Sequence, residues 1–196
     1  TVTATYISRL FFGAHPSFVI PQLEAPAFHV TDPWAFCAYI GLGIVMGGAA
    51  TLFIKTLYAF ENFFDNRIRL SYYLRHVGAM CLVGVMFYIM KQRFGYYYIE
   101  GVGYATVQDI LESNLSVVSF LLLLFVLKLV VTSLTLGSGA SGGVFSPAFF
   151  MGATLGGAYG AILKWMFPAM PISVPAIAVA GMAAMVGAST GARSEE

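Results

Sequence analysis

The chain has 196 residues, of which 59% are hydrophobic and only 10% are charged. Soluble domains average about 25% charged residues, so this composition predicts a multi-pass integral membrane protein. A formal net charge of +1 argues against nucleic acid as a partner, because binding to phosphates requires a strongly basic surface. Two isolated cysteines, Cys37 and Cys81, provide neither a disulfide framework nor a zinc motif, and no pattern indicates another metal or a cofactor.

The first part of the chain is predicted to be a loop followed by a long helix. Residues 1–12 have the character of a helix tail, and the prolines of residues 13–33 forbid a continuous helix there. A helix is expected from Trp34 to about Phe64, with its first part spanning the bilayer. Its glycines between positions 41 and 48 form a small-residue face suited to close helix contact.

The middle of the chain predicts two membrane helices separated by a surface segment. Residues 70–92 form the first helix, 106–114 a short amphipathic helix at the membrane surface, and 115–136 the clearest span. Beyond them, helix 147–166, a proline-rich turn at 168–175 and a short packed helix at 176–190 are expected. Six to seven membrane segments of unequal length result, a pattern typical of transporter interiors.

A glycine-rich run, GSGASGGVFSP, separates the helices at 115–136 and 147–166 and occupies residues 137–147. Unpaired backbone groups in hydrocarbon cost several kcal/mol each, so such a break is tolerated only where it lines a polar cavity or is buried in protein. One interpretation is a dinucleotide fingerprint, since GSGASG fits G-x-G-x-x-G. That motif requires a preceding strand and a later acidic residue, whereas no Asp or Glu occurs between residues 114 and 194.

A second interpretation is an intramembrane serine hydrolase. GASG at residues 139–142 resembles the G-x-S-G motif of such proteases, with Ser141 as the nucleophile. A serine nucleophile requires a base within hydrogen-bond reach. All three histidines precede Ser141, which is the reverse of that family's order, although a segment outside the chain could supply a base.

A third interpretation is an anion site at a helix start. Gly142 and Gly143 allow tight turning, and the amides of Val144, Phe145 and Ser146 have no intrahelical partner at such a start. The positive end of the helix dipole adds attraction for an anion, which would be held loosely enough to move on. A glycine-rich helix crossing with no ligand explains the composition equally well.

Three stretches resemble the CLC family of chloride channels and chloride/proton antiporters. They are GGVFSPAFFMGATLGGAYG, GVGYATVQDIL at 101–111 and AIAVAGMAAMVGASTGA at 176–192. The resemblance implies an all-α inverted-repeat fold with broken, tilted helices, incomplete here. It assigns the backbone N–H groups of Val144 and Phe145 to the chloride site, with Gly143 allowing their approach. Ser146 and Pro147 complete the helix start.

The resemblance also sets the expected function and its open alternatives. Residues 1–192 would be a partial CLC-type transmembrane domain, and residues 193–196 a non-native or truncated end. The function implied is voltage-gated chloride conduction or chloride/proton exchange, without an enzymatic step, by a homodimer in a prokaryotic plasma membrane. The family's G-S-G-x-P and G-[KR]-E-G-P motifs and its pore tyrosine are absent, so channel and antiporter stay undistinguished. A non-transporting membrane fragment is the remaining alternative.

Three ionisable residues invite a role in this function. In place of an internal glutamate found in many antiporters of the family, the nearest candidates are His15 and Glu24, with a loop histidine the simpler interpretation of His15. Lys128 lies in the middle of a predicted span, where a charge costs about 2.5–3.5 kcal/mol on insertion scales. It either biases the field on the approach to the anion or snorkels or pairs with a carboxylate.

Overall fold

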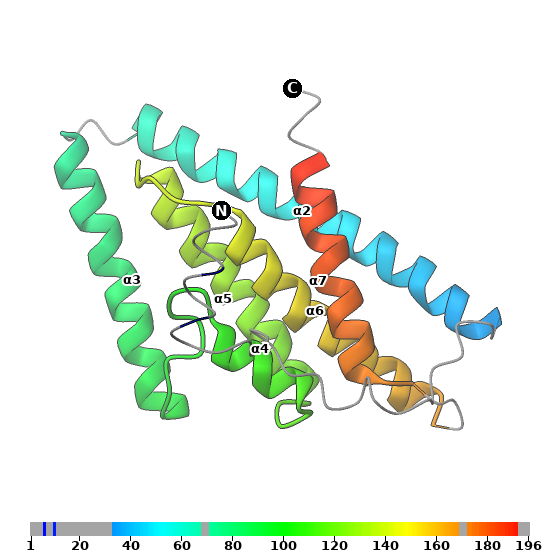
Figure 1. Cartoon of the computed structure of the whole chain (residues 1–196). Coiled ribbons are helices and arrows are strands. Elements are labelled where there is room, and N and C mark those ends of the chain that lie inside the picture. Colours follow the sequence, from blue (N-terminus) through cyan, green and yellow to red (C-terminus); the bar gives the residue numbers. More distant parts are fainter. Residues whose placement is uncertain (1–5, 7–9, 11–32, 68–70, 169–171, 192–196) are drawn as a thin grey trace.

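A computed structural model describes residues 6, 10, 33–67, 71–168 and 172–191. Its helices are α2 (Pro33–Arg67), α3 (Tyr72–Phe94), α4 (Tyr104–Leu111), α5 (Val118–Gly137), α6 (Phe145–Met166) and α7 (Val174–Gly191) (Figure 1). No strand occurs within these ranges, so the all-α prediction is confirmed for them. The expectations for residues 11–32, including His15 and Glu24, and for residues 193–196 lie outside the described residues.

Four of the described helices are long and apolar enough to cross a membrane. They are α2, α3, α5 and α7, and they support the prediction of an integral membrane protein. The predicted six to seven segments also included residues 1–12, most of which lie outside the described residues, and two further segments, α4 and α6, do not qualify as spans. Helix α4 has only 8 residues, and the glycines of α6, together with Tyr159 and Lys164, lower its mean hydropathy.

Two predicted boundaries differ from the structure for identifiable reasons. Helix α6 begins at Phe145, two residues before the expected start at Pro147, because proline is tolerated anywhere in a first turn that has no intrahelical N–H bonds. Helix α4 is amphipathic as predicted, but it covers Tyr104–Leu111 rather than residues 106–114, and its apolar face is buried in the protein. Val107 and Ile110 on that face are fully buried, and the helix packs against α6 and α7.

The helices pack around α5 and α6. Helix α6 lies between α5 and α7, while α2 passes across both α5 and α7 (Figure 1). Helix α3 stands at one edge, where α5 is its main neighbour. The start of α3, the end of α2 and the end of α5 therefore come together at one corner of the molecule.

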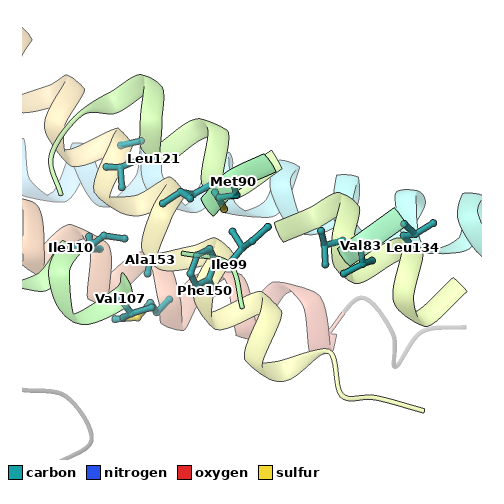
Figure 2. Close-up of a cluster of buried hydrophobic side chains, with 14 of the residues drawn as sticks. Val83, Met90, Ile99, Val107, Ile110, Leu121, Leu134, Phe150 and Ala153 are labelled. Atoms are coloured by element: carbon teal, nitrogen blue, oxygen red, sulfur yellow. The ribbon is translucent and has the colours of Figure 1, made fainter. Parts of the chain in front are cut away.

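One apolar cluster occupies the space between α4, α5 and α6. Figure 2 shows Phe150 of α6 close to Ile99, Val107 and Ala153, all of which are at most 1% exposed. Gly103, which has φ +78°, lies against the Phe150 ring so closely that a Cβ atom would overlap it. The turn before α4 can thus contact α6 this closely because position 103 is a glycine.

Helices α6 and α7 cross at glycines on both sides. A Cβ atom at Gly152 would lie 2.6 Å from the Gly181 carbonyl oxygen, and one at Gly181 would lie 2.6 Å from the Gly152 carbonyl oxygen. Small residues let helix backbones approach this closely, as in membrane helix pairs generally. Gly181 therefore packs within the chain. In the small-residue face predicted between positions 41 and 48, Gly43 and Gly48 have no atom near a Cβ position among the described residues.

Substitution of Gly152 tests this crossing. Gly152→Ala should lower the free energy of unfolding by about 1–3 kcal/mol, because the added methyl group meets backbone atoms that cannot move aside. Gly84→Ala in α3 is the matched control, since nothing lies within 4 Å of a Cβ atom there. The measurement is thermal unfolding of the full-length protein in detergent. Equal unfolding temperatures for the two variants would contradict the close crossing.

Candidate functional site

At the start of the break between α5 and α6, the chain's own amides bond to carbonyl groups in the last turn of α5. After α5 ends at Gly137, the amide of Ser138 donates to the Leu134 carbonyl at 3.1 Å and that of Gly139 to the Leu136 carbonyl at 3.0 Å. Gly139 has φ +101°, a conformation that side-chain-bearing residues rarely adopt. The carbonyl groups at this end of the break are thus partly satisfied by the chain's own amides.

The other end of the break is an open helix start. Val144 is the N-cap residue of α6 and supplies no side-chain cap, unlike the Ser, Thr, Asp or Asn preferred at this position. The first bond of the helix runs from the Ala148 amide to the Val144 carbonyl at 3.0 Å. Within the described residues, the amides of Val144, Phe145 and Ser146 have no acceptor. Pro147 has no N–H group, so these amides are the available donors.

These donors lie at an accessible surface of the chain. Gly143 and Phe145 are exposed, and Val144 and Ser146 are half-buried. Lys128 and Lys164 are the nearest lysine or arginine residues along the sequence, and backbone amides together with the helix dipole supply attraction for an anion at this helix start. Such a site has the donor chemistry for one small anion. The structure thus brings together all five predicted site residues, 143–147, at one helix start, and their role as ligands stays a prediction.

An apolar cavity lies next to this helix start. It has a volume of about 300 Å³ and is lined in part by Leu111, Phe145, Phe149 and Met182. The Phe145 ring is 61% exposed and stacks on Phe149, with ring centroids 6.3 Å apart. The aromatic ring of Phe145 therefore lies next to the free amides and also lines the apolar cavity.

Lys128 binds two backbone carbonyl groups, which neither sequence-based interpretation named as its partners. Its Nζ atom donates to the carbonyl oxygens of Ile99 at 2.9 Å and Gly101 at 2.6 Å, and lies 4.9 Å from the centroid of the Phe150 ring. The residue is only 4% exposed. Among the described residues, Lys128 is therefore buried on backbone carbonyl groups and makes no ion pair with a carboxylate. Lys128 instead fastens the turn before α4 to α5 and α6.

The geometry does not support a hydrolase based on Ser141. Ser141 is exposed, and no described residue forms a hydrogen bond with its side chain. The one described histidine, His76, pairs with Ser138 instead, with Nδ1 3.0 Å from Oγ. Ser138 is fully buried and donates its own proton to the Thr135 carbonyl at 2.7 Å. A hydroxyl oriented in this way does not give its proton to a base, as a nucleophile must.

Sequence analysis missed the residues of α3 that hold the break. Tyr72 donates its hydroxyl to the Gly139 carbonyl, and His76 contacts Ser138. These pairs join residues 67 and 62 positions apart, and α3 has no feature that marks these side chains as different from its other polar residues. Only the packing of α3 against α5 reveals them.

Comparison with known proteins places this site in a family context. The chain matches the profile described as "Voltage gated chloride channel" over residues 1–193. It is 33% identical over 190 residues to a protein of Ralstonia nicotianae named as a ClcB-like chloride channel protein, covering 96% of this chain and 41% of that protein. It is 29% identical over 191 residues to the H(+)/Cl(-) exchange transporter ClcA of Vibrio parahaemolyticus, covering 96% of this chain and 38% of that protein.

The matches confirm the resemblance seen in the sequence. They also show that the chain spans about two fifths of the length of these curated relatives. The start of α6 lies within the matched region.

Replacement of Lys128 tests its structural role. Lys128→Met should lower the free energy of unfolding by about 2 kcal/mol, because two hydrogen bonds from a charged donor are lost and two carbonyl groups are left behind. Lys164→Met, at an exposed position of α6, is the matched control and should change stability little. Thermal unfolding of the full-length protein measures both. A Lys128→Met variant as stable as the control would show that the two hydrogen bonds of Lys128 do not stabilise the fold.

Proposed function

Because the chain belongs to the voltage-gated chloride channel (CLC) family, we propose that it forms part of a chloride transport pathway. Residues 1–192 would be one portion of the transmembrane domain. Chloride would bind at the start of α6 through the backbone N–H groups of Val144 and Phe145, with Ser146 as a further donor. Gly143 would allow close approach of the ion, and Pro147 would help to set the first turn.

The free amides at this helix start carry the proposal. They lie on an exposed break between two helices, where amides without partners cost several kcal/mol in a membrane unless a ligand or water binds them. Neutral amide donors favour weak binding, and weak binding lets an ion leave as well as enter. The rest of the ion's coordination shell would come from the portion of the protein outside this chain.

Relatives of both transport types bear on the mode of transport. One is named as a chloride channel protein and others as H(+)/Cl(-) exchange transporters. We propose chloride transport in either mode, with protons as the second substrate if the protein is an exchanger, and no cofactor. A chloride gradient that drives proton movement across proteoliposomes would identify an exchanger, and chloride flux without proton movement would identify a channel.

The assembly proposed is a homodimer in a prokaryotic plasma membrane, with one pathway in each subunit. All the relatives named above are bacterial. The glycines at positions 43, 47 and 48 of α2 leave space beside that helix for a close neighbour.

Removal of one amide donor tests the anion site. Phe145→Pro in the full-length protein should weaken chloride binding at least about tenfold, because a hydrogen bond to an ion is worth about 1.5–3 kcal/mol. Proline is favoured at the first position of a helix, but it disfavours the φ −89°, ψ −14° conformation of Val144 before it, so the unfolding temperature of the variant is measured beside wild type to confirm that the fold is kept. Chloride binding is measured by calorimetry and transport by chloride efflux from proteoliposomes.

Two control variants separate the donor from other features. Phe145→Leu keeps the N–H group while it removes the ring, and should retain most of the chloride affinity. Ser141→Ala should leave flux unchanged, whereas a serine hydrolase would lose its activity. Wild-type affinity in Phe145→Pro would show that this helix start does not bind chloride.

The proposed dimer has its own test. Light scattering of the full-length protein in detergent should give a protein mass of two subunits. The mass of one subunit would overturn the proposed assembly and leave the anion site untouched.

A further inference from the structure

We propose that Tyr72 and His76, one turn apart on α3, are positioning residues for the anion-binding start of α6. This inference rests on the proposed chloride site, and it adds a helix that carries none of the ion's ligands. Both side chains reach across to the first residues of the break, Ser138 and Gly139. They would set the path of the chain that leads to the free amides.

Tyr72 fixes the orientation of one peptide group. Its hydroxyl donates to the Gly139 carbonyl oxygen. The N–H group of the same peptide unit belongs to Ala140 and points to the Thr135 carbonyl at 3.4 Å. The peptide between Gly139 and Ala140 is therefore held on both of its edges. The Tyr72 ring also fills the space where a Cβ atom at Gly139 would lie, so the fit depends on glycine.

His76 fixes the residue before it. Ser138 donates its hydroxyl proton to the Thr135 carbonyl at 2.7 Å, so the 3.0 Å contact requires His76 to donate from Nδ1 to Ser138 Oγ. Ser138 is fully buried, and the histidine satisfies the acceptor side of its hydroxyl. The Thr135 carbonyl accepts from both Ser138 and Ala140, so both held residues bond to the same group. We call the contacts of Tyr72 with Gly139 and of His76 with Ser138 the anchor.

The anchored residues are near the donors along the chain. Four residues, 140–143, separate Gly139 from Val144, and none of them belongs to a helix. A segment this short spans at most about 17 Å even when fully extended, and Gly142 packs so closely that a Cβ atom would lie 2.9 Å from the Leu136 side chain. We therefore expect a shift at Gly139 to displace Val144 and Phe145, which follow it through these four residues alone.

The chemistry of the anchor also suits an anion pathway. A carbonyl oxygen turned towards an anion would repel it, and α5 ends in carbonyl groups immediately before the amides of α6 begin. The Tyr72 hydroxyl binds the Gly139 carbonyl and holds it towards α3. Loss of that hydroxyl leaves the peptide held only by the long Ala140 bond to Thr135, so we expect a defect in chloride binding beside a small loss of stability.

The decisive variant is Tyr72→Phe, which removes a single oxygen atom. In the full-length protein, chloride affinity measured by calorimetry should fall about fivefold, which is the loss of one ordinary hydrogen bond. The matched control is Tyr73→Phe, because Tyr73 is adjacent, 79% exposed and makes no hydrogen bond with a described residue through its hydroxyl. The control should retain wild-type chloride affinity.

His76 provides a rescue experiment. His76→Leu removes the donor to Ser138 and should weaken chloride binding to a similar extent. His76→Asn places an amide N–H near the position of Nδ1 and should restore affinity towards wild type. A residue needed only to fill space would not be rescued in this way. If His76→Leu does not fold, Tyr72→Phe and the asparagine variant decide the question.

The outcomes separate this inference from the proposed function. Wild-type affinity in both Tyr72→Phe and His76→Leu, together with loss in Phe145→Pro, would overturn the anchor and keep the anion site. An equal loss in Tyr73→Phe would also overturn the anchor, because the effect would not be specific. Wild-type affinity in Phe145→Pro would remove the anion site itself.

Discussion

The cost of an unpaired backbone group in a membrane governs the arrangement around α5 and α6. Most of the chain meets this cost with long helices, and the break between Gly137 and Phe145 leaves further backbone groups outside any helix. At its first end, amides and the hydroxyl of Ser138 return to carbonyl groups of the last turn of α5. At its second end, the amides of Val144 to Ser146 stay open. Three donors without an acceptor among the described residues therefore lie together at the start of α6, where an anion can bind them.

The direction of α6 determines where those donors point, and close packing determines the direction of α6. Backbone contact at Gly152 and Gly181 fixes α6 against α7, since helices this close have few alternative crossing positions. On the opposite side, Phe150 lies against Gly103 and beneath the Lys128 ammonium group. The charge in the middle of the membrane span therefore contributes to the same result as the glycines, because it holds the turn that packs on α6.

Sequence patterns predicted the features that depend on local chemistry. Apolar runs located the long helices to within a few residues, and the run from Gly137 to Pro147 located the break and its five candidate residues. The pattern failed where a partner distant in sequence decides the outcome. The apolar face of α4 is buried because α6 and α7 cover it, and Lys128 binds carbonyl groups almost thirty residues earlier in the chain. A hydropathy pattern contains no information about either partner.

The supports on the two sides of the anion site differ in kind. Downstream of the donors, the crossing of α6 with α7 is backbone against backbone and can hardly adjust. Upstream, the break is held by single hydrogen bonds from Tyr72 and His76, and α3 has few buried residues of its own. Hydrogen bonds of this type are worth about 1 kcal/mol each, whereas overlap between backbones costs more. A change in the path before Val144 is therefore the less costly way to alter the geometry of the amides. Among the helices described, α3 is best placed to set anion affinity without touching the anion.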